Sequence, residues 1–538
     1  RPEGVAKIDV NDVVRAQGAD GLRAVVDAAK SLPFFLVDRI PKDIERRSLV
    51  DALRPVVDAM QRQSHIEQSE LTAVIGARFS LAKRELNQQL ALLERELRRD
   101  RAREHADKLA GDKPGIVVND RQRSELIEQS SAVLTAANAA RIDEAKGAVP
   151  VGLPLLFVRG GRVVGLLRDK EGEAPRLNDL NATEMYGLLV RYADWLRRRV
   201  TEEGVTYDAT TPPFDVPQDL LAFPPKALSS LDSVVSTPVF ARDGSLVSTP
   251  GHHESESLWL HLDPSLGELH VPESPTAADL GGARGLLLEH LLFDFPFVDP
   301  SDRPHLIAAL LLPFARRLVR GCTPLHVIEA PTPGSGKGLL TNLLGIIATG
   351  AVCNGCTLPG EEEEVRKKLS AELAMGRPIV LLDNLPEKRV TDSATLASVL
   401  TSETWTDRLL GATRMLTLPN RAVWLCSANN PRFSLELVRR SVRIRIDPKQ
   451  DMPWHRSGFR HDPILDWARD NRPKLVRALL TLIRAWVAAG GPAGKKSLGS
   501  FESWARVMGG VLEVAGIEGF LANSTAFYAE ADEEGEAW

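Results

Sequence analysis

The chain has 538 residues, of which 43% are hydrophobic and 26% are charged, and its formal net charge is -5 at pH 7. Such a length exceeds what one hydrophobic core organises, so we expect several domains, and the composition excludes an intrinsically disordered protein. The net charge excludes a uniformly basic nucleic-acid-binding protein, so any contact with DNA depends on local clusters of arginine and lysine.

The sequence carries no sign of export or of a membrane span. Its four cysteines are too few for a disulfide framework and indicate a reducing, cytoplasmic setting. No run of about 18 uncharged apolar residues occurs, so we expect no membrane partner. Cys353 and Cys356 form a single CxxC without a second pair. We interpret them as small residues of a Gly-rich loop, with a zinc or redox site as the alternative.

Residues 1–112 predict an α-helical module, because apolar residues recur at helical spacing in 49–63 and 82–101. Residues 113–277 predict an α+β domain. This domain should contain a β-hairpin at 154–165, with two glycines at its turn, and a helix at 182–202. Prolines break the rest of the domain into short strands.

The next domain, 278–450, opens with strongly apolar helical sequence and then presents a strand, a Gly-rich turn and a helix at 325–348. A polyphosphate needs backbone N–H groups unobstructed by Cβ atoms, a helix N-terminus and one lysine. This segment therefore predicts a P-loop that binds ATP. Its predicted nucleotide-binding residues are Pro333, Gly334, Ser335, Gly336, Lys337, Gly338 and Leu339.

The P-loop departs from the usual GxxxxGK[ST] pattern at two positions, because Pro331 replaces the first glycine and Gly338 replaces the final hydroxyl residue. The usual hydroxyl ligand of Mg²⁺ is thus absent. Magnesium keeps several waters and is held mainly by phosphates and one carboxylate, so we still expect Mg²⁺ to accompany ATP. Ser335 and Thr341 are alternative sources of the hydroxyl.

A second buried strand, 378–382, ends in Asp383 and Asn384. Ligands of open α/β sheets bind at the carboxyl ends of strands, so Asp383 is the predicted metal-side residue. Asn384 stands where many ATPases place a glutamate, and it could position the attacking water. A carboxylate of the acidic run 361–364 is the alternative, although such acids are also simply favourable at a helix N-terminus.

A third buried strand, 422–426, leads to Asn429, whose amide could sense the γ-phosphate. Arg439 and Arg440 follow and suit an arginine finger that reaches the ATP of a neighbouring subunit. Ordinary surface arginines are the alternative. Between the second and third strands, 405–418 predicts a β-hairpin. In a ring, such hairpins would project Arg408 and Arg414 into the pore to bind DNA phosphates.

The order of these motifs resembles that of AAA+ ATPases, and more narrowly the helicase part of primase-helicase replication proteins of phages and integrative elements. The resemblance spans residues 150–538. In that resemblance, 330–340 matches the Walker A segment, 379–384 the Walker B segment, 424–430 the sensor segment and Arg439-Arg440 the arginine pair. It implies a multidomain α/β protein with a P-loop AAA+ core built on a parallel sheet.

Two further segments resemble the same proteins at the ends of the chain. Residues 501–521 are similar to their C-terminal module, so we expect 451–538 to form a small helical or winged-helix module. Residues 7–20 resemble the segment that closes the TOPRIM fold of bacterial primases. Because the chain begins with Arg1, we expect it to be part of a longer polypeptide that could carry a primase domain upstream.

The resemblance implies an ATP-dependent DNA helicase or translocase that uses ATP and Mg²⁺. Its partners would be single-stranded or forked DNA and further copies of itself in a ring, taken as a hexamer. Two alternatives stay open. One is an AAA+ initiator, loader or defence ATPase that remodels a DNA or protein complex without unwinding. The other is a module that binds ATP only as a structural clamp.

Overall fold

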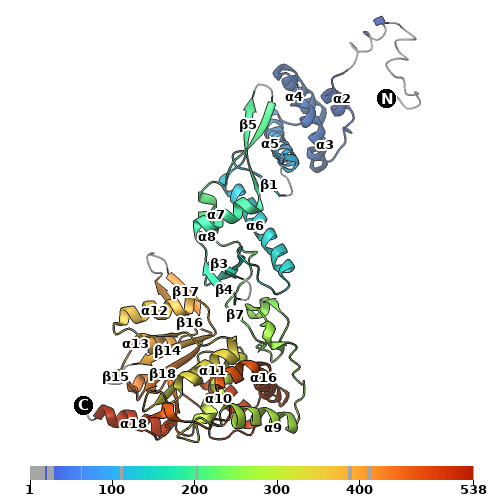
Figure 1. The fold of residues 1–538 in the computed structure, drawn as a ribbon. Helices are drawn as coiled ribbons and strands as arrows, with labels where there is room; N and C mark the ends of the chain where they lie inside the picture. The colour runs from blue at the N-terminus through green and yellow to red at the C-terminus, as the bar shows by residue number, and fades with distance from the viewer. Residues whose placement is uncertain are drawn as a thin grey trace. The chain divides into compact units, whose positions relative to one another are not determined.

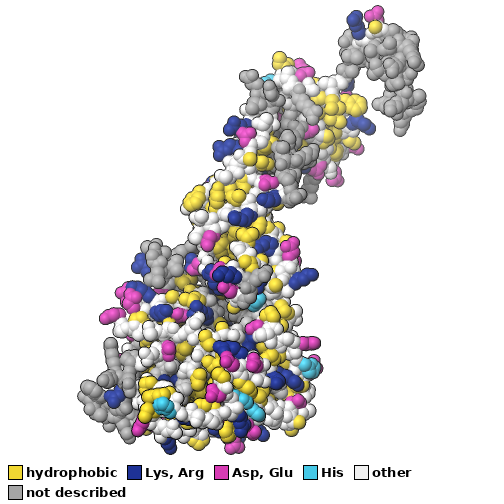
Figure 2. Space-filling view, in the orientation of Figure 1, with side chains coloured by type: hydrophobic (Ala, Val, Ile, Leu, Met, Phe, Trp, Pro, Cys, Tyr) yellow, Lys and Arg dark blue, Asp and Glu magenta, His cyan; other side chains and the backbone are white. Residues whose placement is uncertain are grey.

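The computed structural model describes residues 19–20, 23, 30–61, 63–109, 113–170, 173–201, 204–385, 390–408 and 415–536. Two compact units divide the chain. The first comprises Arg1–Ser130 with Val190–Pro213, and the second comprises Ser131–Leu189 with Phe214–Trp538 (Figure 1). None of the described helices is both long and apolar enough to cross a membrane. Basic and acidic side chains are interspersed over the face drawn in Figure 2, in keeping with the small net charge.

The first unit combines helices with a small sheet. Its helices are α2 (Leu32–Asp38), α3 (Arg46–Met60), α4 (His65–Phe79) and α5 (Lys83–Leu109), followed by the start of α6 (Arg123–Ala145). α3 and α5 confirm the two helices expected from apolar spacing. The helices pack around a common core that includes Val57, Ile75 and Leu86. The segment 7–18, on which the TOPRIM resemblance mainly rests, lies outside the described residues.

The helix predicted over 182–202 is wrong in its second half. α7 spans Ala182–Tyr192, and the chain then forms β5 (Asp194–Thr201). β5 lies between β1 (Gly115–Val117), to which it is parallel, and β6 (Gly204–Ala209), to which it is antiparallel. Backbone pairing with a strand almost eighty positions earlier outweighs the helical propensity of this Leu- and Arg-rich run.

The second unit begins with short strands. The predicted hairpin forms from β2 (Leu155–Arg159) and β3 (Arg162–Leu167), joined by β4 (Arg176–Asp179). Further small elements are α8 (Asp215–Ala222), β7 (Ser233–Val235), β8 (Val239–Phe240), β9 (Leu246–Val247), β10 (Gly251–His253) and β11 (Leu258–Leu260). At the β2–β3 turn Gly160 has φ 55°, and a Cβ there would collide with the carbonyl oxygen of Thr417. Glycine thus lets this turn touch the later part of the unit.

A five-stranded parallel sheet organises the rest of the second unit, as the sequence predicted. Its order is β13 (Gly355–Cys356), β14 (Ile379–Leu385), β18 (Val423–Asn429), β12 (Leu325–Ala330) and β20 (Ser441–Arg445). β12, β18 and the first four residues of β14 are almost fully buried, which explains their continuous apolar sequence. β18 lies between the P-loop strand β12 and the acid-bearing strand β14.

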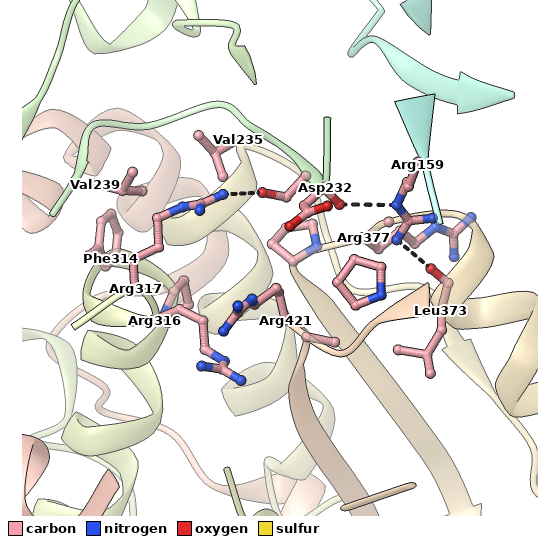
Figure 3. A pocket seen from close by; sticks show the side chains of 16 residues that line it. Arg159, Asp232, Val235, Val239, Phe314, Arg316, Arg317, Leu373, Arg377 and Arg421 are labelled. Atoms are coloured by element: carbon pink, nitrogen blue, oxygen red, sulfur yellow. Dashed lines mark hydrogen bonds between the residues drawn. The ribbon is translucent and has the colours of Figure 1, made fainter. Parts of the chain in front are cut away.

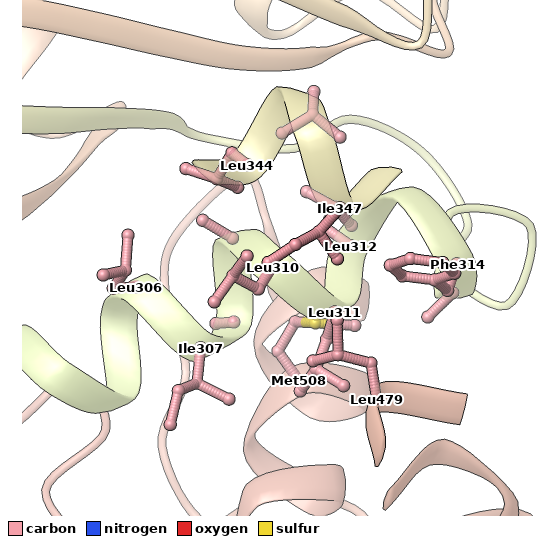
Figure 4. Close-up of a cluster of buried hydrophobic side chains, with 14 of the residues drawn as sticks. Leu306, Ile307, Leu310, Leu311, Leu312, Phe314, Leu344, Ile347, Leu479 and Met508 are labelled. Carbon is pink, nitrogen blue, oxygen red and sulfur yellow. The ribbon is translucent and has the colours of Figure 1, made fainter. Parts of the chain in front are cut away.

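Helices cover both faces of this sheet. One face packs against α10 (Asp302–Ala315), α11 (Lys337–Thr349), α16 (Arg472–Ala488) and α17 (Glu502–Val514), in the core that Figure 4 draws in part. The other face packs against α12 (Glu362–Ala374), α13 (Ala394–Leu400), α14 (Leu435–Val438) and the hairpin of β16 (Thr404–Arg408) and β17 (Met415–Pro419). Alternate residues of β12 serve the two cores, with Val327 on one side and Ile328 on the other.

The C-terminal segment is helical. It contains α15 (Ile464–Asp470), α16, α17 and α18 (Ser524–Glu536), and within the described range 451–536 no strand is present that could form the wing of a winged helix. Of the two expected forms, the helical one is therefore observed. α9 (Ala277–Gly285) and the π-helix Leu286–Leu291 precede α10. The short strands β15 (Val390–Thr391) and β19 (Arg432–Phe433) pair beside the main sheet.

A buried histidine makes the stability of this core depend on pH. His326 of β12 is 0% exposed, and its Nδ1 lies 3.3 Å from the carbonyl oxygen of Trp424. Its ring packs edge-on against Trp504, with centroids 5.6 Å apart. Burial lowers the pKa of His326 from 6.5 to about 4. The folded chain therefore keeps this imidazole neutral at pH values where the unfolded chain protonates it.

We predict that mild acid destabilises the second unit through His326. The contribution of neutral His326 to the free energy of unfolding is full above pH 6.5. It should fall by up to about 1.4 kcal/mol per pH unit as the pH drops from 6.5 towards 4. His326→Leu should flatten that slope in urea unfolding followed by tryptophan fluorescence. The exposed His270, changed to Gln, is the matched control. A slope unchanged in His326→Leu would contradict the prediction.

Candidate nucleotide-binding site

The predicted P-loop has the expected local structure of strand, tight turn and helix. β12 ends at Ala330, and α11 begins at Lys337. Gly334 and Gly336 have φ values of 76° and 104°, a region that residues with a Cβ rarely adopt. The Ser335 hydroxyl donates to the Thr332 carbonyl at 2.5 Å and fixes the turn. The N–H groups that open α11 are thus presented at the end of the sheet.

Lys337 and Asn429 come together although they are far apart in sequence. The Lys337 ammonium donates to Asn429 Oδ1 at 2.5 Å and to the Thr332 carbonyl at 3.4 Å. The reason lies in the sheet, because β12 and β18 are adjacent and their last residues, Ala330 and Asn429, are paired. An ammonium and an amide side chain are therefore available on one side of the turn for an anionic ligand.

The hydroxyl position of the P-loop is open space. Gly338 lies in the first turn of α11, and a Cβ placed on it meets no atom within 4 Å. Of the two alternative hydroxyls, that of Ser335 donates to Thr332 and that of Thr341 donates to the Gly338 carbonyl at 3.1 Å. Both side chains are buried, at 4% and 3% exposed, and both serve the local backbone.

Asp383 and Asn384 stand at the same carboxyl edge of the sheet as the P-loop. Both are exposed. Asp383 pairs with Ser427 of β18 and Leu385 with Ala428, so Asn384 is an extra residue, with φ 57°. Such bulges redirect side chains and recur beside active sites. A Cβ on Gly355 would lie 2.6 Å from that of Asp383, so the neighbouring strand leaves room for the aspartate.

The acidic run at the start of α12 has other partners. Glu362 accepts hydrogen bonds from the Thr395 backbone at 3.1 Å and from its hydroxyl at 2.6 Å. Glu363 and Glu364 form ion pairs with Lys367 at 3.1 and 2.8 Å. These contacts favour the simpler interpretation, in which the run stabilises the N-terminus of α12.

A pocket of about 310 Å³, which the sequence analysis did not predict, adjoins the P-loop. The P-loop supplies Gly334, Ser335, Gly336 and Leu339, whereas apolar walls come from earlier and later segments. These walls include Leu291, Phe295, Pro453, Phe459 and Ile464. A mostly apolar concavity of this size beside a phosphate-binding turn suits a nucleoside. Its walls are too far apart along the chain for any local pattern to reveal them.

Arg439 and Arg440 lie at the opposite end of the sheet from the P-loop. The Leu325 N–H, at the start of β12, donates to the Arg440 carbonyl at 2.9 Å. β12 has six residues, so five steps of about 3.3 Å, or about 17 Å, separate this end from the P-loop end. Arg440 also forms an ion pair with Glu436 at 3.3 Å, whereas the Arg439 side chain is exposed. Neither arginine is placed to meet a nucleotide on its own P-loop.

The predicted hairpin is present, with Arg408 of β16 paired to Met415 of β17. Arg408 is exposed, and Arg414 lies outside the described residues. The inward side chains are anchored to α12, because Trp405 Nε1 donates to the Ser370 hydroxyl at 2.8 Å and that hydroxyl donates to Asp407 at 2.5 Å. The outward face carries Arg408, Met415 and threonines.

The CxxC carries no disulfide, since Cys353 and Cys356 are free thiols. Burial raises the pKa of Cys353 to about 11, so this thiol stays protonated near neutral pH. No group of three or more metal-binding side chains occurs in the part of the chain that the structure describes. Cys356 is buried and Cys353 is partly buried, as expected of packing residues.

No protein-family model and no curated protein matches the sequence. Among solved structures, the chain is similar to SCCmec type IV Cch, described as an active helicase, at 11% identity over 70% of this chain and 73% of that one, with a TM-score of 0.30. It is also similar to the NrS-1 C-terminal region, at 14% identity, coverages of 56% and 69% and a TM-score of 0.26. JCV helicase matches at 11% identity, coverages of 48% and 66% and a TM-score of 0.23. At such scores these likenesses carry no argument about activity.

We predict that Gly338→Ser raises the affinity of the P-loop for Mg·ATP. The open space at this position accepts a side chain, and the new hydroxyl supplies the missing ligand for the metal of Mg·ATP. Affinity for Mg·ATP in calorimetry should rise about fivefold, the equivalent of ~1 kcal/mol. Gly281→Ser, an unobstructed change on α9, is the control. Weaker nucleotide binding by Gly338→Ser would count against a P-loop of the usual geometry.

Proposed function

We propose that this protein is an ATP-dependent DNA helicase or translocase of a phage or mobile-element replication system, acting as an oligomeric ring on single-stranded DNA. The observation that carries the proposal is the contact between Lys337 and Asn429 at the sheet edge that also presents Asp383. The hairpin β16–β17 lies in the chain between the strands that bear Asp383 and Asn429. A nucleotide site and a DNA-facing element would therefore share two neighbouring strands.

The residues at this edge fit ATP with Mg²⁺. Gly334 and Gly336 leave the amides of the turn unobstructed, and the adjoining 310 Å³ pocket has room for the nucleoside. Lys337 would hold the β- and γ-phosphate oxygens, and Asp383 would hold the metal through its waters. When bound, Mg²⁺ neutralises charge on the phosphates. Asn384 would orient the attacking water, and Asn429 would report whether the γ-phosphate is present.

The position of Arg439 supports an oligomer. About 17 Å of strand separates the arginine pair from the P-loop of the same chain, so an arginine finger would have to act on a neighbouring subunit. A head-to-tail interface of this kind closes into a ring when its rotation allows. Arg439 is the better candidate, because Arg440 is held by Glu436.

The hairpin supports contact with a strand of DNA. Arg408 faces outward on β16, and an arginine there can bind phosphates without reading sequence. β17 ends at Pro419, and four residues later β18 begins, which leads straight to Asn429. A change at Asn429 on loss of the γ-phosphate could therefore move the base of the hairpin. That route would couple hydrolysis to translocation.

We predict that Lys337→Ala lowers the rates of forked-DNA unwinding and of ATP hydrolysis by about 100-fold or more, because the phosphates lose their principal cation. Gel-based unwinding and phosphate-release assays measure both. The exposed Lys495, changed to Ala, is the control. Hydrolysis without unwinding or stimulation by DNA would favour a remodelling ATPase instead. ATP binding without turnover in the unaltered protein would favour a clamp.

We predict that Arg439→Ala impairs hydrolysis only through a neighbouring subunit. Mixtures of this variant with Lys337→Ala should regain part of the activity, because an intact P-loop of one chain can meet the intact arginine of the other. Activity is measured as the mixing ratio varies. Mixtures that never exceed the sum of the separate variants would contradict a finger acting between subunits.

A further inference from the structure

Five arginines line one small cavity at the amino-terminal edge of the main sheet (Figure 3). Arg316 and Arg317 directly follow α10, Arg377 precedes β14, Arg421 precedes β18, and Arg159 ends β2. Figure 3 shows Arg316, Arg317 and Arg421 gathered together, with Asp232 between this group and Arg159. This edge is opposite to the P-loop, because all strands of the sheet are parallel and the P-loop follows the carboxyl end of β12.

Three of these guanidinium groups are fixed in place and deeply buried. Arg159, Arg316 and Arg317 are 4%, 6% and 9% exposed. Arg159 donates to the carbonyls of Asp232, Leu373 and Ala374, and Arg316 donates to those of Val319, Gly321 and Asn420. Carbonyl oxygens orient a guanidinium but do not neutralise its charge. The arginines are therefore held rigidly while much of their charge persists.

Carboxylates compensate this charge only in part. Arg317 donates to Ser233 and pairs with Glu256 at 3.4 Å, and Arg377 pairs with Glu372 at 3.6 Å. Asp232 is the one acid among the lining residues, all of which are described, and Glu403 acts on Arg316 from further away. Burial, reinforced by repulsion from Arg421, lowers the pKa of Arg316 to about 10. Positive charge thus remains in excess around the cavity itself.

Donors in the cluster lack partners. The Nε atoms of Arg316 and Arg421 are buried without a hydrogen bond. Among the described residues, the side chain of Arg421 makes no hydrogen bond or ion pair at all. A buried donor left unpaired costs free energy, more so when it is charged. A negatively charged ligand that accepts hydrogen bonds would pair these donors and offset the excess positive charge.

We propose that this cavity binds a phosphate-type oxyanion, at a site separate from the P-loop. The cavity measures about 40 Å³, room for about three waters at 10–15 Å³ each, or for a compact tetrahedral anion whose oxygens take their places. Guanidinium groups approaching from several directions suit such an anion, because each can donate two parallel hydrogen bonds. The anion would be either free phosphate or a phosphodiester of a DNA strand.

The site would also connect two separate segments of the second unit. Arg159 caps the end of α12 through Leu373 and Ala374, and the adjacent Gly160 touches Thr417 of the hairpin. Arg421 follows the same hairpin by two residues and starts the run into β18. An anion bound between them would tie the short-strand segment at β2–β3 to the base of the hairpin. This inference stands without the proposed helicase activity.

Thermal unfolding with inorganic phosphate, against chloride at equal ionic strength, tests the site in the full chain. Phosphate well above its Kd should raise the Tm by about 3 °C, and the rise should persist in Lys337→Ala, which removes the P-loop cation. It should vanish in Arg421→Gln and persist in Arg320→Gln, an exposed arginine near the end of α10. Without phosphate, Arg421→Gln should melt no lower than the unaltered protein, because the change relieves repulsion.

Anisotropy of labelled oligothymidylate across a salt series distinguishes the sources of the anion. If a phosphodiester occupies the cavity, Arg421→Gln should weaken binding and reduce the salt slope by about 1. If free phosphate is the ligand, DNA binding should be unchanged while the phosphate-dependent Tm rise is lost. Arg421→Gln behaving like the unaltered protein in both assays would overturn the proposal.

Discussion

The parallel pairing of β12 with β18 is the interaction on which the candidate site depends. It places Ala330 beside Asn429, and the turn that follows β12 then brings Lys337 within 2.5 Å of the Asn429 amide. On its other side β18 pairs with β14, and Asp383 lies opposite Ser427. The ammonium, amide and carboxylate share one edge because parallel strands end together. Local features such as the bulge at Asn384 change only the directions of individual side chains, whose positions follow from the sheet.

The two ends of the sheet hold different kinds of positive charge. At the carboxyl edge Lys337 stands at the P-loop turn beside an open pocket, which suits a ligand that binds and dissociates. At the amino edge, guanidinium groups are buried and bound to backbone carbonyls, which suits a fixed anion. β18 joins the two, since it begins two residues after Arg421 and ends at Asn429. Any shift of this strand would therefore change the geometry of both the P-loop site and the arginine cavity.

Most elements of the core could be predicted because their signals are local. Continuous apolar runs predicted β12, β14 and β18, and the glycines of the turn predicted the P-loop conformation. The strand β5 was missed, since the pairing that makes 194–201 extended comes from β1, far away in the sequence. The nucleoside-sized pocket and the arginine cavity were missed for the same reason. Their walls converge only after folding.

The sequence by itself located the core strands in the chain, the phosphate-binding turn and the lysine of that turn. It could do so because glycine placement and apolar runs act over a few residues. Tertiary structure alone decided which side chains meet. It joined Lys337 to Asn429 and left the space at Gly338 open. It also set Arg439 at the far edge and gathered arginines from four separate segments around one cavity. Each of these depends on strand adjacency and burial, which no local pattern encodes.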